Sequence, residues 1–390
     1  MENFIAYNPT SLHFGKQVLN DLGKTISKYG DRVLLVYGKN SIKQNGLYNQ
    51  VKFELDKVGA KVFEYSGIKS NPIIEDVDKA SALGRKNRVN VVLAVGGGSV
   101  IDSAKMISVS IPYDGTAWDF FSRKAPAPHT AIPLIAVLTL AATGSEMNPF
   151  AVISNHEAQR KGSYGHDLMF PKHSFLDPTF TMSVPYNYTA YGIADLIAHC
   201  LEAYFGKGEA TLADRFVFAI IKEAIENAQD LLKDLTNYEL RARIMFASTM
   251  ALNGLTMQGR ASGDWGVHNI GHILSLLYDV PHGASLTIVY PAWLRLQKDR
   301  IADRISYLGK NIFNTPDVHL TIERLESFFR LMDCPIRLHE AVPNANREEI
   351  VRVMAYNKVA NNVHKLDADD YRTVVELMTE AGVESLSGQL

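Results

Sequence analysis

The chain has 390 residues, of which 46% are hydrophobic and 21% are charged, and this composition excludes intrinsic disorder. Its 40 basic and 42 acidic side chains give a formal net charge of -2, so charge provides no reason to expect binding to nucleic acid or to an anionic membrane. At roughly 100–200 residues per domain, the length predicts two domains.

The N-terminal half of the sequence alternates between strand patterns and helix patterns. The expected strands are residues 32–38, 61–65, 90–95 and 132–138, and the expected helices are residues 46–58 and 73–86. Nearly continuous apolar runs, as in 32–38, are typical of strands that are buried on both faces of a parallel sheet. The repeated strand–helix units therefore predict a doubly wound, Rossmann-like α/β domain.

The second half of the sequence shows helical periodicity throughout and no convincing strand pattern. The expected helices are residues 188–205, 209–235, 240–257, 267–278, 284–296, 322–331, 347–360 and 368–381. Asp177-Pro178 and Val184-Pro185 interrupt the chain between the two patterns. We therefore expect an α/β domain over residues 1–184 and an all-helical domain over residues 185–390.

Targeting signals are not evident in the sequence. The N-terminus has no charged segment followed by an apolar stretch, and no window approaches the ~20 apolar residues that span a bilayer. The two cysteines, Cys200 and Cys334, are too few for a disulfide framework and are compatible with a reducing compartment. These features predict a cytoplasmic location.

A glycine-rich turn joins one of the buried strands to the next helix. Gly96, Gly97 and Gly98 follow the strand, and Ser99 and Asp102 then form an S-x-x-D pattern, which predicts a helix N-cap with an acid at the third position. Glycines let a ligand approach the backbone, and a helix N-terminus favours phosphate. The motif is not G-x-G-x-x-G, so a tight turn without a ligand is the alternative interpretation.

A second group of residues has the chemistry of a metal site. Asp195 and His199 are four residues apart on an expected helix, as are His268 and His272, and His282 follows in a loop between Pro281 and Gly283. One carboxylate and three imidazoles suit a catalytic divalent metal, either Zn²⁺ or Fe²⁺. Each pair alone could be a salt bridge or a structural histidine, and spacing does not decide which of the five residues would be ligands.

Taken together, these segments resemble the iron-containing alcohol dehydrogenase family, in its NADP-dependent butanol dehydrogenase and aldehyde reductase branch. The resemblance covers essentially the whole chain and rests on residues 96–99, 139–146, 192–204 and 263–283. It implies an α/β domain followed by a helical domain, with the site between them. It also implies one divalent metal ion, Fe²⁺ or Zn²⁺, hydride transfer between NADP(H) and a primary alcohol or aldehyde, and a homodimer.

The resemblance also assigns roles to residues of this sequence. It implies that Asp195, His199, His268 and His282 bind the metal. His272 would then lie near the nicotinamide, either as a proton relay or as a residue that orients its neighbours. The residues implied to line the cofactor cleft are Gly38, Lys39, Asn40, Ser41, Asn71, Gly97, Gly98, Ser99, Asp102, Thr139, Leu140, Thr143 and Lys161.

Cofactor preference can be argued from the turn after the first long strand, residues 37–41, where the fold places the adenosine ribose. An NAD site usually has an acid there, which would repel the extra phosphate of NADP. None of these five residues is acidic, Lys39 adds a positive charge, and Asn40 and Ser41 can donate hydrogen bonds. The turn therefore predicts NADP(H), with a solvated surface lysine as the alternative interpretation of Lys39.

Two other activities use the same residue types. A polyol dehydrogenase of the same fold would need a more polar substrate pocket than the segments around Phe150, Trp265 and Leu276 suggest. A metal-dependent hydrolase could use the same ligands, but it would have no use for the glycine turn. His156-Glu157 is not followed by a second histidine at the H-E-x-x-H spacing, which argues against a zincin protease.

Overall fold

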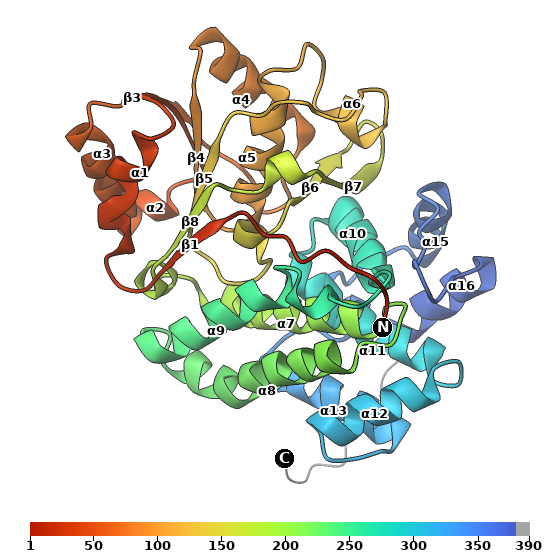
Figure 1. Cartoon of the computed structure of the whole chain (residues 1–390). Coiled ribbons are helices and arrows are strands. Elements are labelled where there is room, and N and C mark those ends of the chain that lie inside the picture. The colour runs from red at the N-terminus through yellow and green to blue at the C-terminus, as the bar shows by residue number, and fades with distance from the viewer. Residues whose placement is uncertain (380–390) are drawn as a thin grey trace.

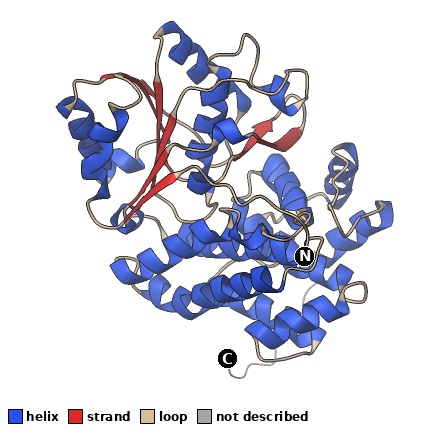
Figure 2. Ribbon diagram, viewed as in Figure 1, coloured by secondary structure: helices blue, strands red, loops and turns tan. Residues whose placement is uncertain are grey.

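The computed structural model describes residues 1–379, and residues 380–390 lie outside the described part of the chain. It consists of a sheet half, residues 11–185, and a helical half, residues 186–379 (Figures 1 and 2). Among the described residues, no helix is long and apolar enough to cross a membrane.

Six parallel strands form the central sheet of the sheet half. Their bounds are β1 Ser11–Phe14, β2 Arg32–Tyr37, β3 Lys61–Tyr65, β4 Val91–Gly96, β5 Leu134–Leu138 and β8 His173–Leu176. They lie in the order β1-β8-β5-β4-β2-β3, with Val33 paired to Val91 and Val92 paired to Leu134. The parallel, doubly wound architecture expected from the sequence is confirmed.

Alternate side chains of the central strands pack into two separate cores. Val33 and Leu35 face α1 (Leu22–Ile26) and α3 (Leu47–Lys57). Leu34 and Val36 face the other way. That second face is covered by α4 (Ile74–Lys86) and α5 (Gly98–Ser110), so helices bury the sheet on both sides.

Several elements of the sheet half were not expected from the sequence. The edge strand β1 and its neighbour β8 are only four residues long, and an antiparallel hairpin of β6 (Phe150–Asn155) and β7 (Arg160–Gly165) stands apart from the main sheet. The hairpin strand β7 reads RKGSYG, which has no apolar alternation to reveal it. Short helices α2 (Ser41–Gln44) and α6 (Trp118–Phe121) complete this half.

The helical half is built around α7, α10 and α11, which share one large hydrophobic core. Its helices are α7 Tyr186–Tyr204, α8 Thr211–Lys233, α9 Tyr238–Ala251, α10 Gly266–Tyr278, α11 His282–Gln297, α12 Ala302–Ile312, α13 Val318–Leu331, α14 Leu338–Ala341, α15 Arg347–Tyr356 and α16 Ala368–Leu377. The expected helices match within a few residues, except that the predicted helix 240–257 ends at Ala251 and that α12 and α14 were not expected. Ala381, the expected end of the last helix, lies outside the described residues.

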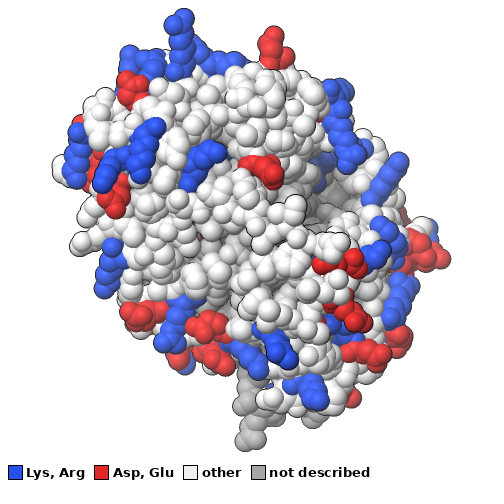
Figure 3. All heavy atoms as spheres, viewed as in Figure 1, with Lys and Arg blue, Asp and Glu red and all other residues white. Residues whose placement is uncertain are grey.

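The boundary between the halves falls between β8 and α7, while the first residues of the chain cross to the helical half. The backbone N–H of Glu2 donates to the carbonyl of Gly259, and Asn8 donates to the carbonyl of Asn253. Figure 3 shows basic and acidic side chains interspersed over one face of the molecule, which is hollowed near its middle, where few charged side chains lie.

Candidate active site

Helix α7 presents three buried polar side chains from one of its faces. Asp195, His199 and Glu202 are spaced i, i+4 and i+7, so they lie above one another along the helix. Their exposed fractions are 2%, 5% and 1%. Burying polar groups without partners costs free energy, so three buried polar side chains on a largely apolar helix indicate a functional site.

Helix α10 and the start of α11 supply the other imidazoles. His268 and His272 lie one turn apart on α10, which ends at Asp279 in the left-handed conformation, and His282 is the first residue of α11. Gly283 is needed at this point, because a Cβ there would lie 2.2 Å from the carbonyl oxygen of Tyr191 on α7. The glycine lets the start of α11 approach α7 closely and so brings His282 to Asp195.

Three of the predicted metal ligands, the imidazoles, surround the carboxylate of the fourth, Asp195. Its Oδ1 lies 3.6 Å from His199 Nδ1, 3.7 Å from His268 Nε2 and 3.6 Å from His282 Nε2. Asp195 Oδ1, His199 Nδ1 and His268 Nε2 are buried and have no hydrogen-bond partner among the described residues.

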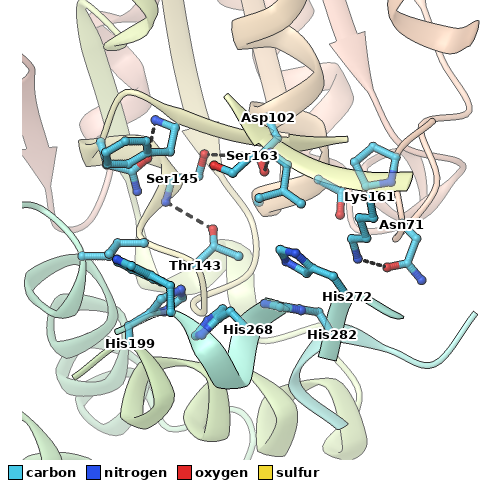
Figure 4. A pocket seen from close by; sticks show the side chains of 18 of the residues that line it. Asn71, Asp102, Thr143, Ser145, Lys161, Ser163, His199, His268, His272 and His282 are labelled. Carbon is cyan, nitrogen blue, oxygen red and sulfur yellow. Dashed lines mark hydrogen bonds between the residues drawn. The ribbon is translucent and has the colours of Figure 1, made fainter. Parts of the chain in front are cut away.

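This arrangement fits a divalent metal ion. One ligand atom from each of Asp195, His268 and His282 lies within 4.8 Å of the others. The separations of 3.6–3.7 Å between Asp195 Oδ1 and the two imidazole nitrogens are ones that two metal–ligand bonds of roughly 2 Å can span. His199 lies beside them, with its ring centroid 4.7 Å from that of His268. His272 is further along, 5.5 Å from His282 between ring centroids, and is not in the three-residue group. Figure 4 shows the imidazoles of His268, His272 and His282 facing the same space.

Glu202 lies within the α7 segment 192–204, but no role was expected for it. Its Oε1 accepts hydrogen bonds from the backbone N–H of His268 at 3.0 Å and from His268 Nδ1 at 2.9 Å. The carboxylate therefore keeps a proton on Nδ1 and leaves Nε2 facing Asp195. Burial alone would lower the pKa of His268, but its interactions with Asp195 and Glu202 raise it to about 9.

The glycine turn differs from its predicted capping arrangement. Helix α5 begins at Gly98 with Gly97 as the N-cap, so Ser99 is inside the helix and its hydroxyl donates to the carbonyl of Ser70. Asp102 does not complete a capping box: its carboxylate accepts from the Ser145 hydroxyl at 2.5 Å and from the Val152 N–H at 2.9 Å. The predicted S-x-x-D cap is therefore wrong, because Asp102 instead fixes the segment after β5 to the hairpin.

A cavity of about 400 Å³ joins the glycine turn to the imidazole cluster. It brings together ten of the predicted residues: Asn71, Gly98, Ser99, Asp102, Thr143, Lys161, His199, His268, His272 and His282. Gly38, Lys39, Asn40, Ser41, Gly97, Thr139 and Leu140 are not among the residues that line it, although all follow strands β2, β4 or β5 at the same end of the sheet. That carboxyl end is where open α/β sheets bind dinucleotides.

Known proteins match this chain over almost its whole length. A model described as iron-containing alcohol dehydrogenase matches residues 9–178, and a model of the C-terminal part of the Fe-containing alcohol dehydrogenase family matches residues 189–382. The chain belongs to the iron-containing alcohol dehydrogenase family. The resemblance drawn from the sequence motifs is thereby confirmed.

The names of related proteins specify different nicotinamide cofactors. A probable NADH-dependent butanol dehydrogenase 2 of Bacillus subtilis is 43% identical and covers 96% of this chain and 99% of its own length. The NADPH-dependent aldehyde reductase YqhD of Escherichia coli is 34% identical over 87% of this chain and 89% of its own. The solved structure of NADH-dependent butanol dehydrogenase A from Thermotoga maritima superposes with a TM-score of 0.94, at 34% identity, and covers 97% of this chain and 99% of that one.

In this alcohol dehydrogenase family member, a hydrogen-bonded chain links the two halves beside the imidazoles. Lys161 Nζ on the hairpin donates to Asn71 Oδ1 at 2.8 Å (Figure 4). Asn71 Nδ2 in turn donates to Asp279 Oδ1 at 2.7 Å. Burial lowers the pKa of Lys161 to about 8, although Asp102, Asp279 and Asp195 oppose that shift. Lys161 therefore places an amine whose pKa lies close to neutral pH beside the predicted metal ligands.

The surface of the cavity is mainly apolar, as expected, but several polar side chains contribute to it. Phe150 and Trp265 line it, but Leu276 does not and instead belongs to the core of the helical half. Polar side chains that were not predicted to belong to the site also line the cavity: Ser145, Asn148, Ser163, Asn269 and Asn362.

Lys105 is a second buried residue that the motifs did not identify. Its ammonium, fully buried under the cavity wall, donates to Ser145 Oγ at 2.7 Å, Asn148 Oδ1 at 3.0 Å and the Phe150 carbonyl at 2.7 Å. All three acceptors belong to residues that line the cavity. A lysine seven residues into a helix that begins with a glycine turn carries no distinguishing signal in a single sequence.

Proposed function

We propose that this chain catalyses reversible hydride transfer between a nicotinamide dinucleotide and a primary alcohol or aldehyde. The observation that carries the proposal is the single cavity in which a glycine turn at the carboxyl end of a parallel sheet meets buried imidazoles that converge on Asp195. The printed names of the relatives, butanol dehydrogenase and aldehyde reductase, support the same reaction class.

The proposed metal ligands are Asp195, His199, His268 and His282, and the ion is Fe²⁺ or Zn²⁺. When bound, a divalent ion acts as a Lewis acid that polarises the substrate oxygen. The nearest imidazole nitrogens of His199, His268 and His282 lie 3.6–3.7 Å from Asp195 Oδ1, and Glu202 bonds to His268, which supports this ligand set. Burial of the site excludes water and strengthens these electrostatic interactions.

The chain offers two groups for the proton that accompanies hydride transfer. His272 is 6% exposed and lines the cavity, and burial lowers its pKa well below the ordinary value, which favours the neutral imidazole that can accept a proton. We propose His272 as the relay, with Lys161 as the neighbouring cation. The alternative role, in which His272 orients its neighbours, predicts a much smaller loss of turnover on its removal.

The finer proposal for the cofactor is a preference for NADP(H). The turn after β2 supports it, because Lys39, Asn40 and Ser41 are exposed there and no acid is present. A Cβ added at Gly38 would meet its nearest atom, the carbonyl oxygen of Ile68, at 3.6 Å, so the turn has room for a side chain and the absence of an acid is not forced by packing. The relatives' names include both NADH-dependent and NADPH-dependent enzymes, so the proposed preference for NADP(H) rests on the turn alone.

The proposal extends to a homodimer that acts on small alcohols and aldehydes in the cytoplasm. A metal-dependent hydrolase is disfavoured by the family membership and by the glycine turn. A polyol dehydrogenase of the same fold remains the second candidate, because the asparagines and serines of the cavity wall could bind hydroxyl groups.

A spectrophotometric assay tests the proposal directly. Protein freed of metal and then reloaded with Fe²⁺ under anaerobic conditions, or with Zn²⁺, is mixed with NADPH or NADH, and the absorbance at the reduced nicotinamide band is followed after addition of butanal or of dihydroxyacetone. We expect metal-dependent consumption of the reduced cofactor with butanal. Consumption with dihydroxyacetone alone would favour the polyol dehydrogenase, and no consumption with either carbonyl compound would refute the proposal.

A further inference from the structure

Ring contacts order the residues along the cavity. The Trp265 indole lies 5.4 Å from His268, His268 lies 5.3 Å from His282, and His282 lies 5.5 Å from His272, all between ring centroids. Lys161, which donates a 2.8 Å hydrogen bond to Asn71, lies beyond His272 in this series (Figure 4). Trp265 is therefore at one end of this series and Asn71 is at the other.

The cofactor would bind at the end that contains Asn71, because the carbonyl of the adjacent Ser70 accepts a hydrogen bond from Ser99 of the glycine turn. The opposite end is left for the part of the substrate that extends away from the reacting carbon. Trp265, at that end of the series, lines the cavity, as do Leu252, Phe150, Asn148 and Asn362.

The backbone of Trp265 has an unusual conformation. Its φ of 62° and ψ of 12° lie in the left-handed region, which bulky side chains rarely adopt. Such conformations persist where the surroundings impose them, and they cluster at functional sites. A glycine or asparagine would adopt this backbone more easily, so the presence of tryptophan requires an explanation in the side chain.

The residue before Trp265 shows how this conformation is imposed. Asp264 is fully buried, and its carboxylate accepts hydrogen bonds from the N–H groups of Val363 at 3.1 Å and His364 at 2.8 Å and from Asn361 Nδ2 at 2.6 Å. The Asp264 backbone is also bonded at both ends, to the Glu202 carbonyl at 3.0 Å and to the Asn362 N–H at 2.7 Å.

Glycine at position 263 makes room for the indole, because a Cβ there would lie 2.7 Å from Trp265 Nε1. The indole packs in T-shaped contacts against His199 and His268, with ring centroids 6.3 Å and 5.4 Å away, and it lines the cavity.

We propose that Trp265 sets the upper size of the substrate by closing the end of the cavity beyond the metal-binding residues. The substrate class is then short, unbranched primary alcohols and their aldehydes. This inference rests on the proposed function, since it concerns the same cavity and the same reaction.

Replacement of the indole by smaller side chains tests the proposal. We expect Trp265→Leu to raise the ratio of kcat/KM for octanal to kcat/KM for butanal by about tenfold or more, because one added methylene in an apolar pocket already changes binding by roughly that factor. Trp265→Phe should give a smaller rise in the same direction. Metal content, measured by mass spectrometry, should stay at the wild-type level in both variants.

A matched control removes a different tryptophan. Trp118 stacks on Phe121 in α6 and does not line the cavity, so Trp118→Phe should leave the octanal-to-butanal ratio unchanged. A second measurement does not depend on turnover: binding of butan-1-ol should quench the tryptophan fluorescence of the wild type and of Trp118→Phe, and the quenching should be lost in Trp265→Phe.

The outcomes separate this inference from the proposed function. If the wild type oxidises neither NADPH nor NADH when any of the aldehydes is added, the proposed function itself is wrong. If the wild type is active and metal-loaded Trp265→Phe and Trp265→Leu keep the wild-type ratio, the role of Trp265 is wrong and the proposed function stands. Should Trp265→Leu fail to fold, an unchanged ratio in Trp265→Phe, or unchanged fluorescence quenching in it, overturns the inference.

Discussion

Glu202 provides the sharpest test of how the metal-binding residues are held. The carboxylate is 1% exposed and accepts two hydrogen bonds from His268, one from the backbone and one from the ring. Glu202→Gln keeps the size and shape of the side chain but removes its charge. The substitution therefore weakens the orientation of His268 without creating a cavity.

The size of the effect follows from these two hydrogen bonds. Bonds to charged groups contribute about 1.5–3 kcal/mol and neutral ones about 0.5–1.5 kcal/mol, so each bond loses about 1 kcal/mol. Loss at both bonds amounts to about 2 kcal/mol, or roughly 30-fold in affinity at 1.4 kcal/mol per factor of ten. Partners of metal-binding histidines typically contribute a factor of about 10–100, which includes this value.

The assay measures metal affinity by competition with a chelator, separately from turnover. Glu326→Gln is the matched control, because Glu326 is also a buried carboxylate but is bonded to Arg295 and Arg337, away from the imidazoles. We expect Glu202→Gln to bind Zn²⁺ about 30-fold more weakly and Glu326→Gln to bind it like the wild type. Equal affinity in Glu202→Gln and the wild type would refute the role of Glu202.

Three further predictions follow from the other residues. Gly38→Asp should shift the kcat/KM ratio from NADPH toward NADH, because the new carboxylate repels the extra phosphate; an unchanged ratio would contradict the cofactor proposal. His272→Ala should keep its metal and lose turnover by a factor of about 10²–10⁴, whereas loss of the metal itself would make His272 a ligand. Burial lowers the pKa values of His13 and His173, whose nitrogens lie 3.0 Å apart, below the ordinary 6.5. The neutral pair thus stabilises the fold above pH 6.5, and this contribution is lost as the pH falls below 6.5. The difference in Tm between the wild type and His13→Phe should therefore be smaller at pH 5.5 than at pH 8, and a larger difference at pH 5.5 would contradict this reasoning.

The sequence was informative wherever the local pattern reflects burial. The apolar runs at β2 and β4 predicted buried strands, and the i, i+4 spacing of Asp195 and His199 placed both on one helix face. It was uninformative for β1, β7 and β8, because these strands are short or polar and their pairing is decided by distant segments. Long-range pairing leaves no period in a single strand.

Within the site, too, contacts between residues far apart in the sequence could not be predicted from local patterns. Ser99 and Asp102 matched a local capping pattern, but Asp102 instead bonds to Ser145 and Val152, 43 and 50 residues away. Glu202 lies on the same helix face as Asp195 and His199, and that i+7 spacing could have singled it out. Its bond to His268, 66 residues away, depends on how α7 packs against the start of α10, which only the folded chain shows.

The central claim is that Asp195, His199, His268 and His282 bind one divalent metal in the cavity that also binds the nicotinamide cofactor. Anomalous diffraction from a crystal of the metal-loaded protein soaked with NADP⁺ measures this directly. We expect one anomalous peak about 2.0–2.2 Å from a donor atom of each of the four residues, with the nicotinamide ring in the same cavity. A peak at another position, or one that His272 ligates in place of any of the four, would contradict the account.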